Sequence, residues 1–156
     1  MDSQGSEWTV EVQIAPQFAR LVDADLVRRA AIATLAHEEA TGRGEVSLVI
    51  TDDEEIHDLN RRFRGVDAPT DVLAFGVEGE DAAFVTAPEA PVLLGDVIIS
   101  CPRAQEQAVE ADHPLSAEIQ LLVVHGVLHL LGHDHAQTEE KAAMWARQEE
   151  ILRALQ

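Results

Sequence analysis

The chain has 156 residues, 46% of them hydrophobic and 26% charged, which predicts one globular domain over residues 1–156 and excludes a disordered or collagen-like protein. Acidic residues outnumber basic ones by 29 to 11, and the net charge of −18 opposes nonspecific contact with nucleic acid, so no DNA partner is expected. A single cysteine, no apolar run near the roughly 20 residues of a membrane span, and no signal-peptide pattern indicate a cytoplasmic protein without a membrane partner.

The first half of the chain alternates predicted strands and helices. In chain order we expect a strand at residues 9–14, a helix from Asp23 or Asp25 to about residue 40, a strand at residues 45–51, a helix capped by Asp52 or Asp53, and a strand at residues 71–75. Residues 1–7 are expected to be flexible. In the second helix Leu59 and Phe63 follow the apolar 3–4 spacing, so we expect both side chains to pack in the core.

The second half completes the predicted fold. We expect an acidic loop at residues 76–91, a strand at residues 93–100, a helix at about residues 102–111, a helix that begins within residues 113–116 and runs to Leu131, and a last helix from Thr138. Ser116 is a possible cap, and Ala142, Trp145 and Ile151 are expected to face the core. The pattern predicts an α/β (α+β) domain with a four-stranded mixed sheet packed with about five helices.

Three histidines around Gly132 form the strongest candidate site. His125 and His129 are four residues apart in a predicted helix, so their side chains share one face. Gly132 ends that helix, and His135 follows in the turn, where it can supply a third nitrogen. Taken without His135, the first two histidines have an alternative explanation: a pair of buried core side chains that are hydrogen-bonded to other residues. The full spacing H-x3-H-x2-G-x2-H predicts a zinc site with three protein ligands and one open position.

The residue after the first histidine separates this pattern from a protease motif. Metzincin proteases have the same histidine spacing, but a glutamate follows their first histidine and acts as general base. Gly126 occupies that position, so peptide hydrolysis by that mechanism is not expected. Asp134 can orient a ligand or shape the turn, and His133 is expected to face solvent rather than to bind the metal.

Four segments together resemble a known family. Residues 125–135 (HGVLHLLGHDH) resemble the H-G-x-L-H-L-x-G-Y-D-H motif of the YbeY-type endoribonucleases, the bacterial rRNA maturation factors. Residues 59–75 are similar to the family's L-N-x-x-[YF]-R-x-x-D-x-P-T-[DN]-V-L-S-F, and residues 94–100 to its L-G-D-I-x-I-S, while Glu139, Glu140 and Met144 match its ending. The chain departs from these motifs at His133, Ala74 and Gly76, where the family usually has tyrosine, serine and often proline. None of these changes removes a proposed ligand.

This resemblance implies a function that composition does not indicate. It implies a zinc ion bound by the three histidines and metal-dependent, single-strand-specific cleavage of RNA. It further implies a role in maturation of the 3′ end of small-subunit rRNA and in ribosome quality control. The implied partners are single-stranded or ribosomal RNA and the ribosome or its proteins.

Arg64 matches the arginine of the family motif and is our candidate catalytic residue. Its planar guanidinium suits a phosphate, whose developing charge it would stabilise during cleavage. The alternative is that Arg64 pairs with Asp67 or Asp71 and braces the loop. Arg61 and Arg62 are expected either to guide the RNA backbone or to form a solvated helix face.

The remaining candidates have structural explanations. Asp71 and Asp96 are expected at strand ends, where bonding to backbone amides or an arginine is favoured over a role as general base. Cys101 is expected to be a small packed side chain. Two other functions stay open: a metallohydrolase of another substrate, and a non-catalytic ribosome assembly factor with a structural zinc, whose acidity would suit basic ribosomal proteins.

Overall fold

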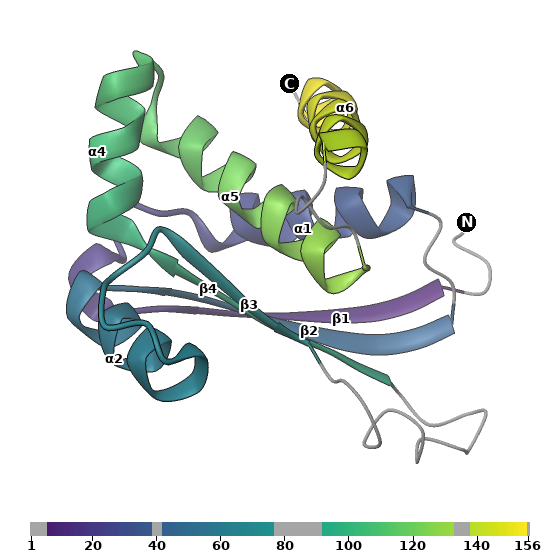
Figure 1. Cartoon of the computed structure of the whole chain (residues 1–156). Helices are drawn as coiled ribbons and strands as arrows, with labels where there is room; N and C mark the ends of the chain where they lie inside the picture. Colours follow the sequence, from purple (N-terminus) through teal and green to yellow (C-terminus); the bar gives the residue numbers. More distant parts are fainter. Residues whose placement is uncertain (1–5, 39–41, 77–91, 133–137, 156) are drawn as a thin grey trace.

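A four-stranded mixed sheet forms the centre of the computed structural model, which describes residues 6–38, 42–76, 92–132 and 138–155 (Figure 1). The strands are β1 (Ser6–Ile14), β2 (Gly42–Thr51), β3 (Val72–Gly76) and β4 (Val92–Ser100). Their order is β1-β2-β4-β3, with β1, β2 and β4 parallel and β3 antiparallel to β4 at the sheet edge. The predicted four-stranded mixed sheet is confirmed.

Five α-helices and one short 3-10 helix lie within the described residues. They are η1 (Pro16–Phe18), α1 (Ala24–His37), α2 (Asp53–Arg64), α4 (Cys101–Ala111), α5 (Leu115–Leu130) and α6 (Thr138–Leu155). Of the predicted alternatives, Asp23 caps α1 and Asp52 caps α2, each accepting a hydrogen bond from a backbone amide of the first turn. No described helix is both long and apolar enough for a membrane crossing.

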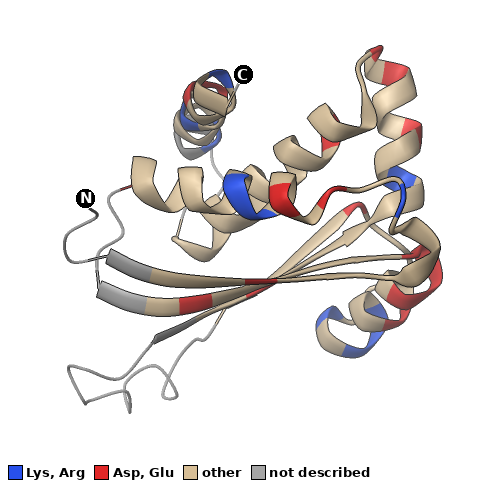
Figure 2. Cartoon of the chain, turned by 180° about the vertical axis from the view of Figure 1, so that it is seen from behind, with Lys and Arg blue, Asp and Glu red and all other residues tan. Residues whose placement is uncertain are grey.

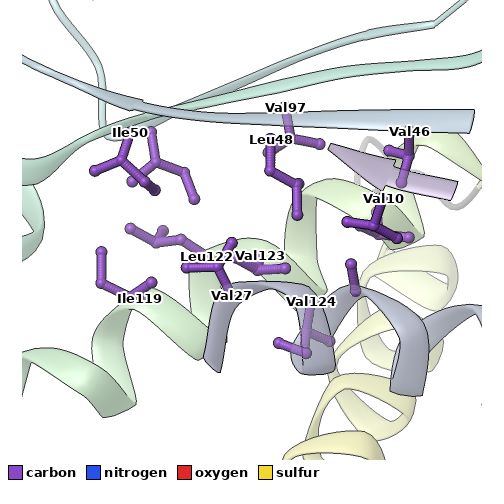
Figure 3. Close-up of a cluster of buried hydrophobic side chains, with 14 of the residues drawn as sticks. Val10, Val27, Val46, Leu48, Ile50, Val97, Ile119, Leu122, Val123 and Val124 are labelled. Carbon is purple, nitrogen blue, oxygen red and sulfur yellow. The ribbon is translucent and has the colours of Figure 1, made fainter. Parts of the chain in front are cut away.

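The large core lies on the face of the sheet that α1 and α5 cover. Alternate side chains of the strands point to this face because successive residues of a strand alternate in direction. Figure 3 shows Leu48 and Val97 of the sheet above Leu122 and Val123 of α5, and Val46 beside Val10. The helices α4 and α6 pack against α5 from outside. This core holds α5 tightly on the sheet.

The opposite face carries α2 alone among the described helices (Figure 1). Ile56 of α2 packs there on Leu73 and Ile98 of the sheet. At its first turn, α2 is also tied to α4, because Arg103 Nε donates to Asp53 Oδ1 at 3.0 Å. The same helix also contacts the edge strand β3.

The element boundaries match the prediction closely, with two corrections in the helices. Ser116 does not cap α5, because the helix already begins at Leu115 after Pro114, and its first turn has no side-chain cap. Ile151 is buried as expected, but Ala142 and Trp145 are exposed, because the buried stripe of α6 runs through Met144, Gln148 and Ile151.

The two segments expected to lack regular structure fall largely outside the described part of the chain. The strand β1 begins at Ser6, two residues inside the segment 1–7 that was expected to be flexible. Gly76 is the last residue of β3, and the rest of the predicted acidic loop at 76–91 is not described.

Candidate functional site

The two histidines of α5 lie together on the wall of one groove. His125 and His129 are one helical turn apart, which places them on the same side of α5, as predicted. Half of the residues of α5 are buried in the core, but His125 is half-buried and His129 is exposed. Both imidazoles are accessible because their side of the helix faces the groove rather than the core.

Gly126 sets how closely this helix approaches the sheet. It is buried, and a Cβ atom at this position would lie 2.6 Å from Cγ1 of Val97 in β4. Val97 is fully buried and β-branched, so its side chain cannot move aside cheaply. The position that holds a general base in metzincins is therefore occupied by a helix–sheet contact with no room for a side chain.

The groove has a volume of about 610 Å³ and runs around the edge strand β3. Its walls come from three elements that lie on both faces of the sheet. The lining residues are Phe63 and Arg64 of α2, Thr70, Asp71, Val72, Ala74, Phe75 and Gly76 in and before β3, and His125, Gly126 and His129 of α5. The short edge strand therefore brings the end of α2 and the histidine face of α5 to one cavity.

Gln148 of α6 orients the His125 ring from behind. Its side chain is 2% exposed, and its Oε1 lies 3.1 Å from His125 Nδ1. Because an amide oxygen only accepts hydrogen bonds, this contact requires a proton on Nδ1, and in the neutral ring Nε2 is then the unprotonated nitrogen. Hydrophobic periodicity missed this residue, since a glutamine in a helix gives no sign of being buried.

The third predicted ligand, His135, lies outside the described residues, as do His133 and Asp134. Within the part of the chain that the structure describes, no group of three histidine, cysteine or acidic side chains is placed to hold a metal ion. The structure therefore brings together His125 and His129, and it leaves the predicted three-ligand set as a prediction.

Arg64 lines the same groove from the end of α2. It forms no ion pair with Asp67 or Asp71, the two partners considered in the alternative. Asp67 instead lies 2.8 Å from His57 Nε2, and the Asp71 carboxylate accepts a hydrogen bond from Gln107 Nε2 at 3.2 Å. The guanidinium of Arg64 thus belongs to the groove and not to a brace of the loop.

The other two arginines of the last turn of α2 form a solvated face. Arg61 Nη2 lies 2.5 Å and Arg62 Nε 3.0 Å from the carboxylate of Asp58, and all three side chains are about half exposed. The hydrogen bond from Arg61, together with the nearby charge of Arg62, holds the pKa of Asp58 below its usual value. Figure 2 shows the resulting polarity of α2, acidic at its start and basic at its end.

The structure corrects two further expectations. Phe63 does not pack in the core: it is 63% exposed, whereas Leu59 is partly buried against Ile56 and its neighbours. Asp96 does not lie at a strand end but in the middle of β4, and it does not line the groove. Cys101 is buried as expected, and burial raises the pKa of its thiol.

Asp71 does lie at a strand end, directly before β3. Among the described residues its carboxylate is bound by side chains, and not by backbone amides or an arginine. Thr70 Oγ1 donates to Oδ1 at 3.3 Å, in addition to the contact from Gln107. Asp71 thus fixes the start of the edge strand while it lines the groove.

Comparison with known proteins identifies similar chains over nearly the full length. The family described as Endoribonuclease YbeY matches residues 13–156. An Endoribonuclease YbeY from Roseiflexus castenholzii is 51% identical over 151 residues, which covers 96% of this chain and 94% of that protein. An Endoribonuclease YbeY from Chloroflexus aurantiacus is 50% identical over 149 residues, covering 95% and 96% of the two chains. The solution structure of TM1509 from Thermotoga maritima matches with a TM-score of 0.61 and 23% identity over 94% of this chain and 89% of that one, which supports the fold.

Proposed function

Because this chain belongs to the YbeY endoribonuclease family, we propose that it is a zinc-dependent endoribonuclease that cleaves single-stranded RNA in the groove around β3. The proposed zinc ligands are His125, His129 and His135, and Arg64 is the proposed catalytic contact with the scissile phosphate. One observation carries this proposal: Arg64 and two imidazoles line a single groove although their helices cover opposite faces of the sheet.

The donor set of the groove fits a zinc ion. Imidazole nitrogen is a preferred zinc ligand, and two imidazoles on successive turns of a helix are a common half of such a site. The hydrogen bond to Gln148 makes Nε2 of His125 the unprotonated nitrogen, as a ligand must be. His135 enters the set from the sequence spacing and the resemblance.

The residues of the groove have separate tasks in the proposed reaction. A zinc ion there would supply a Lewis acid and a bound water whose pKa is lowered toward about 7. Arg64 presents a planar fork of N–H donors that matches two oxygens of a phosphodiester, so it stabilises the negative charge that develops there. Gln148 holds the ring of His125 in one tautomer and orientation. Gly126 contributes no base and keeps α5 close to the sheet.

The openness of the groove favours catalysis over a structural zinc. Structural zinc sites are closed by four protein ligands, whereas catalytic sites keep a position open to water or substrate. His129 is exposed, and a cavity of about 610 Å³ lies in front of it. This arrangement supports an enzyme over an assembly factor in which the zinc only stabilises the fold.

We propose the 3′ end of small-subunit rRNA as the natural substrate and ribosome quality control as the wider role. The resemblance supports both. The ribosome or its proteins would then be partners, and the net charge of −18 supports contact with basic ribosomal proteins beside the RNA.

Metal analysis combined with a cleavage assay tests the proposal. Purified full-length protein should contain about one zinc per chain and cut a single-stranded oligoribonucleotide but not a peptide panel. His125→Ala, His129→Ala and His135→Ala should each lose zinc and cleavage. His37→Ala is the matched control, because His37 lies on α1 and bonds Glu38 and Glu150 far from the groove.

Each alternative has its own outcome in this experiment. Full zinc content in His135→Ala would remove His135 from the ligand set. Cleavage of peptides but not of RNA would indicate a different metallohydrolase. Normal rRNA maturation in cells that contain only Arg64→Ala protein would indicate the assembly factor.

A further inference from the structure

Phe63 presents an open aromatic surface at the mouth of the groove. It lies in the last turn of α2 and is 63% exposed. The chain has four phenylalanines and no tyrosine, and two of the four, Phe63 and Phe75, line this groove. Exposed apolar surface gathered at a functional site marks a contact with a ligand or partner.

Packing against the sheet does not account for this ring. Ile56 and Leu59 lie on the same stripe of α2, and both reach the small core on the sheet. Among the described residues the Phe63 ring has one aromatic neighbour, Phe75, with ring centroids 5.6 Å apart and planes tilted by 60°. Because Phe75 is itself packed against that core, it holds the Phe63 ring in place and leaves most of its surface open.

Cationic side chains border the ring in a chain that is otherwise strongly acidic. The guanidinium carbon of Arg62 lies over the Phe63 ring, 5.4 Å from its centre. Arg64, the next residue after Phe63, also lines the groove. A flat apolar surface bordered by cations matches a nucleotide, which has a flat aromatic base and an anionic phosphate. A purely apolar ligand would gain nothing from the arginines.

We propose that Phe63 is a stacking platform for one unpaired base of the RNA strand, next to the phosphate that Arg64 contacts. This inference rests on the proposed function, because the strand on the platform is the substrate of the groove. In a duplex both faces of each base are covered by neighbouring bases, so only an unpaired base can stack on the ring. Phe63 therefore selects single strands over duplexes.

Binding to a slowly cleaved RNA tests the platform. The probe is a fluorescent 2′-O-methyl oligoribonucleotide, used single-stranded and as a duplex, at one salt concentration with zinc-loaded full-length protein. Phe63→Ala should weaken binding of the single strand by about 5- to 150-fold, the effect of removing one base–aromatic stack. Binding of the duplex should change by less than about 2-fold, because its bases never reached the ring.

Two further variants separate the aromatic ring from other effects. Phe63→Trp keeps a stacking surface and should bind the single strand at least as tightly as the wild type. Val109→Ala removes another exposed apolar side chain, 79% exposed on α4 and outside the groove lining, and should change nothing. Thermal melting and zinc content should be unchanged in Phe63→Ala, and Phe63→Leu carries the same test if the alanine variant does not fold.

Removing single bases identifies the partner of the ring. An abasic residue is placed at each position of the probe in turn. At one position it should weaken binding to the wild type but not further weaken binding to Phe63→Ala, because both changes remove the same contact. Additive losses at every position would overturn the proposal.

The platform and the proposed function fail in different ways. If Phe63→Ala binds the single strand like the wild type, or weakens single strand and duplex equally, the platform is refuted while RNA cleavage by the wild type still stands. If the wild type neither binds nor cleaves single-stranded RNA, the proposed function itself is refuted.

Discussion

The two faces of the sheet differ in how much they bury. On the face covered by α1 and α5, buried apolar residues extend from Val10 in β1 to Ile151 in α6. On the face covered by α2, the buried cluster consists of Ile56, Leu73 and Ile98. The groove is open to both faces, because it runs around the edge strand β3.

This difference separates two tasks within one site. The deep core fixes α5 and thus the positions of His125 and His129, which a metal site needs to within fractions of an ångström. The face covered by α2 has a small core and leaves Phe63 and Arg64 exposed to solvent. There they would be accessible to the proposed RNA substrate, whatever its sequence. We therefore expect substitutions on the first side to affect stability, and those at the end of α2 to affect activity.

The largest expected effect on stability comes from the deep core. Leu48→Ala should lower the free energy of unfolding by about 2–5 kcal/mol, because Leu48 is fully buried and truncation leaves a cavity. Leu59→Ala is the matched change on the face covered by α2, and it should cost only about 1 kcal/mol because Leu59 is partly exposed. Urea unfolding of both variants measures the two losses, and equal losses would contradict the comparison.

Arg64→Ala should affect activity alone. RNA cleavage should fall by about 10²- to 10³-fold, the usual effect of losing one group that stabilises transition-state charge. The melting temperature should not change, since Arg64 forms no ion pair with another described residue, and Arg64→Lys should restore part of the rate. Arg61→Ala serves as the control, because Arg61 pairs with Asp58 outside the groove lining. Unchanged cleavage by a folded Arg64→Ala protein would refute the catalytic role.

Two glycine substitutions compare the room between α5 and the middle of the sheet with the room between α5 and the edge strand. Gly126→Ala should cost about 1–3 kcal/mol of stability despite the better helix propensity of alanine, because the new methyl group would overlap Val97. Gly76→Ala at the end of β3 should be nearly neutral, since its Cβ would lie 3.6 Å from Leu130 Cδ2, an ordinary contact. Thermal melting tests this, and a neutral Gly126→Ala would show that α5 can move on the sheet.

The smallest effect concerns the rim where α1 meets α6. The hydrogen bond to Glu38, and then that to Glu150, raises the pKa of His37 above 6.5. The protonated ring therefore stabilises the fold below about pH 6.5, and this contribution disappears as the pH rises through the raised pKa. His37→Asn should lower the melting temperature at about pH 5.5 but hardly at about pH 9. Glu150→Gln should remove part of this pH dependence. If the difference in melting temperature between the wild type and His37→Asn did not change with pH, the predicted role of the His37 charge would be contradicted.

Local patterns predicted the elements and the histidine pair well. Val46, Leu48 and Ile50 alternate with more exposed residues, and this alternation is the direct consequence of strand geometry that the structure shows. His125 and His129 line one groove because residues four apart in a helix lie on the same face.

Features that depend on distant elements could not be predicted from such patterns. Hydrophobic periodicity correctly places Phe63 on the apolar stripe of α2. Whether the sheet extends far enough to cover this side chain depends on where the edge strand lies, which the local sequence does not indicate. Gln148 is buried because His125, on another helix, binds it, while the more apolar Trp145 is exposed. Hydrophobicity alone would predict the opposite, with Trp145 buried and Gln148 exposed.

The hydrogen bond between His125 and Gln148 also has a consequence for the order of events during translation. Twenty-three residues separate the two partners in the chain, so the ribosome adds the histidine well before the glutamine. Until α6 has been made and has docked, neither ring nitrogen of His125 is selected by the amide, and the ring samples both tautomers. The Nδ1-protonated form of this ring is thus favoured only once α6 has been made and has docked on α5.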